Sequence, residues 1–231
     1  MSEDELTRPS GNSSQTLSRG LRILRVLADH PEGLSVTELS RAMQTHRAGV
    51  YRLLRPLLDD RLVDRSGTAH YRLGLGLVEL ASQVRPRLQQ VAAPELQRLA
   101  DELRATVALT VRDGDEAVVL LVLEPRSTDM HIAYRAGLRH RLNVAAPGLA
   151  ILAANPPEPD EREEVSRARI RGWARSAGEL LTGATGVGVA LTTSSNQTDV
   201  AISAVWIAER DEEATARLVM RTATILSGML R

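Results

Sequence analysis

The stretch from Gly33 to Gly74 constrains this chain most, because it combines two short helical patterns, a tight joint and a two-stranded ribbon, in that order. Ser35 and Glu38 form an S-x-x-E capping box, in which each side chain satisfies a free backbone N–H at a helix start. A joint at residues 44–46 leads into a second helix. Its apolar residues recur at helical spacing and predict one buried face: Val50, Leu53, Leu54, Leu57 and Leu58.

The opposite face of this second helix is predicted to be exposed and basic. Arginine side chains can fork onto phosphate or guanine, so this face suits a major groove. Leu62–Arg65 and His70–Leu73 then predict two strands around a turn that contains Gly67, which together form a wing. The residues expected to contact DNA are Thr45, His46, Arg47, Tyr51, Arg52 and Arg55 from the joint and helix, and Arg65, His70 and Arg72 from the wing.

The net charge of zero over 231 residues conceals a basic first domain. Residues 15–75 hold ten arginines and six acidic residues, which gives a local net charge of +4. This modest excess predicts weak sequence-independent attraction to DNA and places more of the affinity on dimerisation and base contacts. A winged helix that docks onto protein instead of DNA is the alternative.

Composition excludes several enzyme classes. The chain has no cysteine, and all 29 of its Lys+Arg residues are arginine, so thiol nucleophiles, disulfides, Schiff-base lysines and Walker A loops are absent. We expect no catalytic residues, no metal site and no cofactor. We see no signal peptide and no apolar run long enough to cross a membrane, so a cytoplasmic location without membrane association is expected.

The first domain resembles the IclR-type transcriptional regulators. The resemblance depends on L-S-V-T-E-L-S at residues 34–40, V-Y-R-L-L at 50–54 and Y-R-L-G at 71–74, and it runs from about Leu17 to the C-terminus. The sequence departs from the family at Gln44 and Arg61, where glycine is usual, and at residues 48–49, where Ser-Thr is usual. Pro56 inside the second helix is a further departure, since proline removes a backbone donor.

The second half of the chain predicts an α+β domain with one antiparallel sheet. Its expected order is a helix at 94–104, strands at 106–112 and 116–124, a third strand at Met130–Arg135, helices at 146–154 and 161–173, strands at 185–193 and 199–206, and a closing helix at 209–230. The expected domains are a disordered tail at 1–14, the winged helix-turn-helix at 15–74, a linker helix at 75–90 and a GAF-like effector-binding and oligomerisation domain at 91–231; the GAF-like assignment is implied by the resemblance.

Both faces of the last two strands lack charge, so something must cover each face. On one face the small residues Gly186, Gly188, Ala201 and Ser203 leave room for either an inserted helix or a ligand. The family motif L-H-A-T-x-x-G-K-A corresponds to residues 142–150, where the histidine, threonine and lysine are absent. The expected effector-binding residues are Arg135, Asn143, Ala145, Gly148, Gly186, Gly188, Ala201 and Ser203.

These features predict a regulator that binds an inverted-repeat operator in double-stranded DNA as a homodimer or a dimer of dimers. The resemblance implies control by a small-molecule effector, which the lost polar residues predict to be apolar or weakly polar. Repression fits this picture, although the sequence leaves repression and activation open. The alternative is a protein-binding winged-helix module with a vestigial effector pocket.

Overall fold

The computed structural model describes residues 14–67, 69–127, 134–192, 198–207 and 209–230. The chain divides into two compact units, Met1–Arg85 and Pro86–Arg231. The tail expected at residues 1–14 and most of the strand expected at Met130–Arg135 lie outside the described residues. Within the described residues, no helix is long and apolar enough to cross a membrane.

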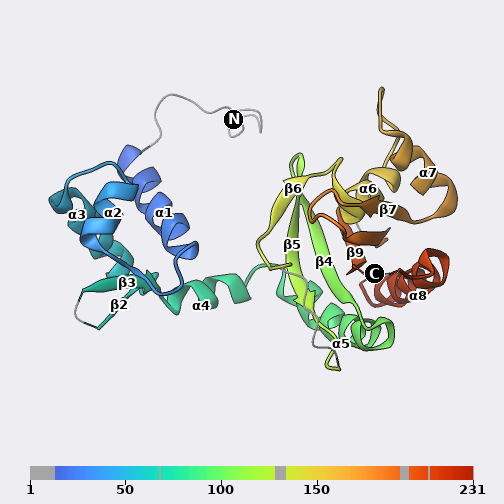
Figure 1. The fold of residues 1–231 in the computed structure, drawn as a ribbon, viewed down its shortest axis with the longest axis horizontal. Helices are drawn as coiled ribbons and strands as arrows, with labels where there is room; N and C mark the ends of the chain where they lie inside the picture. Colours follow the sequence, from blue (N-terminus) through green and yellow to red (C-terminus); the bar gives the residue numbers. More distant parts are fainter. Residues whose placement is uncertain (1–13, 68, 128–133, 193–197, 208, 231) are drawn as a thin grey trace. The chain divides into compact units, whose positions relative to one another are not determined.

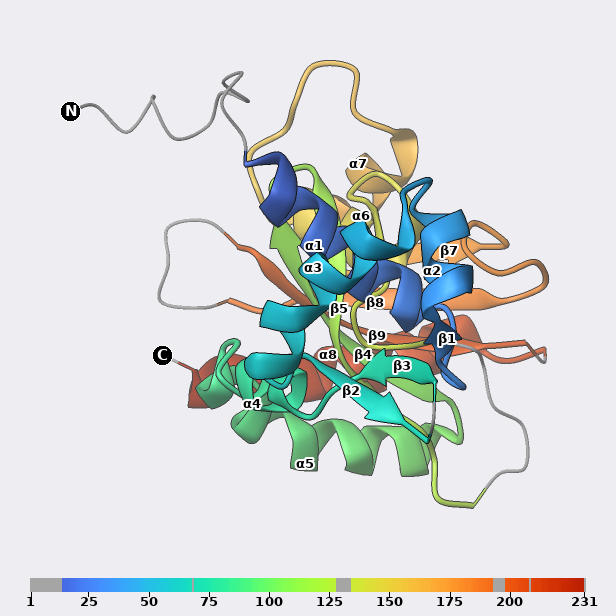
Figure 2. The ribbon, with the colours of Figure 1, turned by 90° about the vertical axis from the view of Figure 1, so that its left-hand side faces the viewer.

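The first unit is the expected winged helix-turn-helix (Figures 1 and 2). Its helices are α1 (Gln15–Ala28), α2 (Val36–Ala42), α3 (Arg47–Asp59) and α4 (Gly76–Ser82). The wing strands β2 (Val63–Ser66) and β3 (His70–Leu73) pair as an antiparallel hairpin. A short strand that the sequence did not predict, β1 (Leu34–Ser35), pairs with the other edge of β3.

Local signals in the sequence account for the helix boundaries. The capping box is present, since the Ser35 N–H donates to Glu38 Oε2 at 2.7 Å and the Glu38 N–H donates to Ser35 Oγ at 3.3 Å. The predicted stripe of α3 is buried at Val50, Leu53, Leu54 and Leu57 and packs against α1 and α2. Pro56 lies inside α3, which continues to Asp59, so the expected helix survives the missing donor.

Gln44 and Arg61 occupy backbone positions that favour glycine. Their φ angles are 49° and 56°, in the left-handed region. A residue with a Cβ atom pays about 1–2 kcal/mol to adopt this conformation, because the Cβ lies too close to a backbone carbonyl oxygen. We expect Gln44→Gly and Arg61→Gly together to raise the free energy of unfolding by about 1 kcal/mol, because relief of strain exceeds the added entropy of the unfolded chain. Denaturant unfolding measures this, and a loss of stability in both single variants would contradict it.

The second unit is a six-stranded antiparallel sheet with two helices on each face (Figure 1). The strand order is β6-β5-β4-β9-β8-β7. The strands are β4 (Thr106–Asp113), β5 (Glu116–Leu123), β6 (Arg139–Arg141), β7 (Ala174–Ala177), β8 (Thr185–Ala190) and β9 (Val200–Trp206). The helices are α5 (Pro86–Leu103), α6 (Ala145–Ala153), α7 (Glu163–Arg171) and α8 (Glu212–Met229).

Each face of the sheet has its own apolar core. On one face, branched residues such as Val187 and Ile202 pack against α5 and α8. The other face carries small residues, and Ala174 and Ala201 pack there against Ala146 and Leu149 of α6. The prediction that both faces are covered is therefore confirmed, and small side chains lie where α6 approaches closely.

One predicted helix begins earlier in the structure, and two strands were not predicted. Helix α5 begins at Pro86 rather than Pro94, because Leu88 and Ala92 extend its buried stripe and the helix contains Pro94. Strand β6 at Arg139–Arg141 was missed, since only His140 of its three residues is buried. Strand β7 was missed because Ala174–Ala177 is short and follows directly on the predicted helix at 161–173, which is observed as α7.

Candidate functional site

The exposed face of α3 presents the side chains that the sequence predicted for DNA. His46, Arg47, Tyr51, Arg52 and Arg55 are all exposed. Tyr51 is 56% exposed, and tyrosine side chains are enriched at interfaces. Thr45 is half-buried, and its Oγ1 lies 3.1 Å from where a Cβ on Gly49 would stand, so it packs at the start of α3.

The wing places its basic residues around the central strand β3. Arg65, His70 and Arg72 are exposed, while Tyr71 is buried and anchors the hairpin. In the ladder, Arg72 lies directly opposite Asp64. Opposite charges at this position attract each other, so the charge of Arg72 is partly offset before any phosphate approaches.

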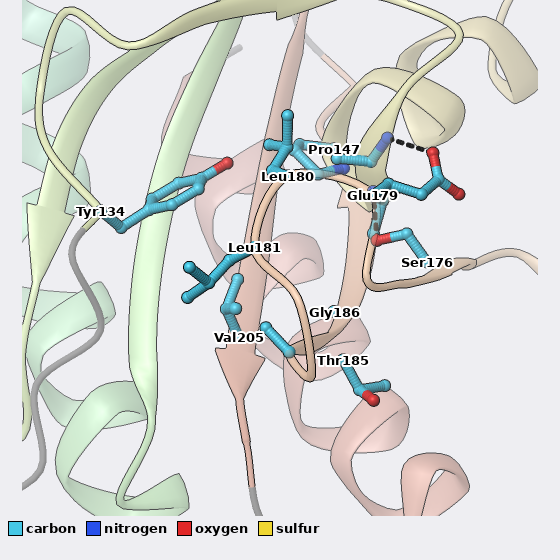
Figure 3. A pocket seen from close by; sticks show the side chains of 12 residues that line it. Tyr134, Pro147, Ser176, Glu179, Leu180, Leu181, Thr185, Gly186 and Val205 are labelled. Atoms are coloured by element: carbon cyan, nitrogen blue, oxygen red, sulfur yellow. Dashed lines mark hydrogen bonds between the residues drawn. The ribbon is translucent and has the colours of Figure 1, made fainter.

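In the second unit, a cavity of about 30 Å³ lies between the start of α6, strands β7 and β8, and the loop at residues 178–183 (Figure 3). Most of its wall is apolar. It is lined by Tyr134, Ala145, Ala146, Pro147, Ser176, Glu179, Leu180, Leu181, Ala184, Thr185, Gly186 and Val205. Among the described residues, no group of three or more metal-ligating side chains could hold a metal ion.

The start of α6 forms one wall, and its backbone donors are already engaged. Ala145 has a φ of 63°, a strained value for a residue with a Cβ. The Ala145 N–H donates to Glu179 Oε2 and the Ala146 N–H donates to Ser176 Oγ, each at 2.9 Å (Figure 3). Pro147 has no backbone N–H. Both free backbone N–H groups at this helix start, those of Ala145 and Ala146, therefore already donate to side chains of the protein.

Glu179 is held by a two-point ion pair. Arg162 Nη1 donates to Glu179 Oε2 at 3.1 Å and Arg162 Nη2 donates to Oε1 at 3.2 Å. The hydrogen bond to Glu179 is the main cause of a raised pKa at Arg162. Arg162 also donates to the carbonyl of Asn143 at 2.6 Å and to Glu164 at 3.2 Å. The carboxylate of Glu179 is thereby fixed against α6.

The small residues predicted to share one sheet face do so, but they have different neighbours. The register pairs Gly186 with Val205, Gly188 with Ser203 and Ala190 with Ala201. Gly186 lines the cavity. A Cβ on Gly188 would lie 2.5 Å from the carbonyl oxygen of Ala146, so α6 occupies that end of the face. Of the two possibilities drawn from the sequence, the inserted helix holds at Gly188.

The remaining predicted effector residues lie outside the cavity wall, apart from Ala145. Ala201 and Ser203 are fully buried beneath the helices, and Ser203 Oγ has no hydrogen-bond partner among the described atoms. Gly148 is in close contact with Leu142, since a Cβ there would lie 2.3 Å from the Leu142 carbonyl oxygen. Asn143 and Arg135 are exposed. Their assignment to effector binding stays a prediction.

Several lining residues were missed by sequence reasoning. Tyr134, Ser176, Leu180 and Leu181 come from two separate loops and an edge strand, and only the fold brings them to one place (Figure 3). A signal available in the sequence was the pair Gly178 and Gly183, which encloses Glu179. Both glycines have left-handed φ angles, of 69° and 81°, and they delimit the loop that covers the cavity.

Comparison with known sequences identifies related proteins. The IclR helix-turn-helix domain matches residues 16–67, and the bacterial transcriptional regulator IclR C-terminal domain matches residues 81–162. An HTH-type transcriptional regulator of Mycobacterium tuberculosis is 37% identical over 167 residues, 71% of this chain and 63% of that protein. The regulator TtgV of Pseudomonas putida is 31% identical over 146 residues, 62% of this chain and 56% of that protein. The chain therefore spans less than two thirds of these relatives.

Solved structures extend the likeness of fold over nearly the whole chain. An IclR transcriptional regulator from Alicyclobacillus acidocaldarius aligns over 95% of this chain and 100% of its own, with 21% identity and a TM-score of 0.77. An IclR homologue from Microbacterium hydrocarbonoxydans, complexed with 4-hydroxybenzoate, aligns over 94% and 99%, with 22% identity and a TM-score of 0.82. With both family domains in order on this two-unit fold, the chain belongs to the IclR family of bacterial transcriptional regulators.

Proposed function

We propose that this chain is a transcription regulator that binds an inverted-repeat operator in double-stranded DNA and responds to a small-molecule effector. The observation that carries the proposal is the exposed arginine face of α3 opposite its buried leucines, followed directly by a wing. Arg47, Arg52 and Arg55 would read base edges and phosphates in the major groove, while Arg65 and His70 would contact phosphate. The named functions of the relatives support this reading.

The exposed apolar surface of the first unit supports the proposal of a homodimer. On α1, Leu17 and Leu21 are 62% and 49% exposed, and on α4, Val78 and Leu80 are 64% and 60% exposed. Surfaces of this kind mark protein interfaces. A second copy of the chain is the proposed partner, because one helix and one wing read only a few base pairs and the local charge is low. A dimer of dimers would use a further contact between two such pairs.

The double variant Leu17→Glu/Leu21→Glu is expected to sediment as a smaller species than the wild-type protein at micromolar concentration. Four like charges, two from each subunit, would be buried in an apolar interface without partners. Ile170→Glu is the matched control, since Ile170 is 89% exposed on α7 in the other unit. A wild-type protein that is already monomeric at this concentration would contradict the proposal.

The cavity beside α6 is the proposed effector site. It joins one apolar wall to a few polar groups, as small-molecule sites do. The complex of a family member with 4-hydroxybenzoate supports ligand binding within this fold. A thermal-shift screen of metabolites tests the effector site, since a ligand at 100 times its Kd adds about 2.7 kcal/mol of stability. A stabilising ligand should then change the DNA mobility shift of the same protein, and a ligand that binds without changing it would contradict regulation.

The second candidate function is a protein-docking winged helix with a vestigial pocket. The small volume of the cavity, about 30 Å³, favours this alternative. It predicts that no metabolite raises the melting temperature and that the protein leaves the mobility of DNA upstream of its own gene unchanged. The regulator proposal predicts the opposite in both assays.

A further inference from the structure

We propose that the effector of this chain is a small uncharged molecule with a hydroxyl or carbonyl group, because Glu179 already holds the position that a ligand carboxylate would take. This inference rests on the proposed effector-binding function and adds the chemical class of the ligand. Four features of the cavity support the inference. They are backbone donors that are already bonded, a carboxylate that is paired with an arginine of the protein, hydroxyl groups that can bond a ligand, and a loop between two glycines.

The first feature is the resident carboxylate at the start of α6. Ala145 is left-handed and the helix that follows is right-handed, a conformation that turns successive N–H groups toward one side and suits an anion. Here that anion is part of the protein, since Glu179 Oε2 accepts from the Ala145 N–H at 2.9 Å. Ser176 takes the next donor at the same distance. A ligand carboxylate would have to displace one of them.

The second feature is that the described residues of the wall offer no spare positive charge. No arginine or histidine is among the residues that line the described part of the cavity. The guanidinium of Arg162 lies behind Glu179 and is engaged by Glu179, Glu164 and the Asn143 carbonyl. A carboxylate entering the cavity would lose its hydration, gain no counter-charge and lie beside Glu179. An uncharged ligand meets none of these penalties.

The third feature is a set of hydroxyl groups that suit a neutral polar group. The phenol of Tyr134 is protonated at neutral pH and can donate or accept, and burial raises its pKa further, to about 12. Its hydroxyl points across the cavity toward Leu180 (Figure 3). Ser176 Oγ accepts from the Ala146 N–H, which leaves the hydroxyl proton of Ser176 for another acceptor. A hydroxyl or carbonyl oxygen on the ligand can use both groups.

The fourth feature is the loop that forms one wall of the cavity. A volume of about 30 Å³ holds only about two water molecules, so a larger ligand that lies wholly inside requires the wall to move. Leu180 and Leu181 are each 38% exposed and lie between Gly178 and Gly183. A Cβ on either glycine would meet no atom within 4 Å. Rotation at these two residues would move the leucines outward, and the apolar body of the ligand would take their place.

The test compares phenol with benzoate on the full-length protein at neutral pH, where phenol is uncharged and benzoate is ionised. Calorimetry or thermal shift should show phenol binding at least about tenfold more tightly than benzoate, the size of effect that one nearby like charge produces. Tyr134→Phe should weaken phenol binding several-fold, which places the probe in this cavity. Benzoate that binds as tightly as phenol would overturn the proposal while leaving effector binding intact.

Glu179→Gln should abolish the preference. This variant removes one of the two carboxylates bonded to Arg162 and leaves an uncharged, weaker acceptor for the Ala145 N–H, so benzoate should gain about tenfold while phenol changes little. Glu164→Gln is the matched control, because it removes the other carboxylate bonded to Arg162 from outside the cavity and should keep the wild-type preference. Equal benzoate affinity in wild-type and Glu179→Gln proteins would overturn the role of Glu179. Binding of neither probe to the wild type would overturn both this inference and the effector site.

Discussion

Replacing Gly188 by alanine is expected to cost the protein about 3 kcal/mol of unfolding free energy, the upper part of the usual range for overpacking. The added Cβ would lie 2.5 Å from the carbonyl oxygen and 2.6 Å from the carbonyl carbon of Ala146. Both atoms belong to the backbone of α6, which is buried along most of its length and cannot move away as a flexible side chain can. Denaturant unfolding measures the loss directly.

Gly186→Ala is the matched control for this prediction. The two glycines lie on the same strand and face the same side of the sheet. A Cβ on Gly186 would meet Ser176 Oγ at 3.2 Å and the Ala146 Cβ at 3.6 Å, contacts that a small adjustment accommodates. We expect this variant to change stability by less than about 1 kcal/mol. Equal losses in the two variants would show that α6 does not fix the spacing at Gly188.

Replacing Arg52 by alanine is expected to lower operator affinity about 5-fold to 150-fold, equivalent to 1–3 kcal/mol for a bidentate base contact. Arg52 is exposed and lies beside Leu53 and Leu54, which fix the orientation of α3 in the core of the first unit. Affinity is measured by mobility shift at several salt concentrations. A contact to a base should also relax sequence preference at one operator position.

Arg98→Ala is the control for Arg52→Ala, since the Arg98 side chain is 72% exposed in the second unit and carries the same charge. It should leave operator affinity unchanged. If Arg52→Ala changes neither the affinity nor the dependence of affinity on salt, the assignment of the α3 face to DNA is wrong.

The first unit could be predicted almost completely because its signals are local. A capping box, a helical stripe and a strand–turn–strand pattern each lie within a few residues of the element they define. Backbone strain at Gln44 and Arg61 was harder to predict. The family resemblance indicated that glycine is usual at these positions, but only the backbone angles reveal the strain. Strand β1 has two residues and depends on pairing with β3, which no local pattern encodes.

The second unit could be predicted in outline, whereas its cavity could not. Gly186 and Gly188 look equivalent in the sequence, yet one lines the cavity and the other touches the backbone of α6. The difference depends on where helix α6, which lies earlier in the chain at Ala145–Ala153, crosses the sheet. Tyr134 and Leu181 reach the cavity through tertiary packing alone. The role of Glu179 beside Ala145 likewise required the structure.

Footprinting of the DNA upstream of the chain's own gene tests the central claim most directly. The full-length protein should protect two inverted half-sites whose centres lie about 10 bp apart, or a multiple of that distance, because two recognition helices related by a two-fold axis must meet the same side of the duplex. Protection should be lost with Arg52→Ala at the same protein concentration. Protection of a single half-site, or equal protection of unrelated DNA, would contradict the account.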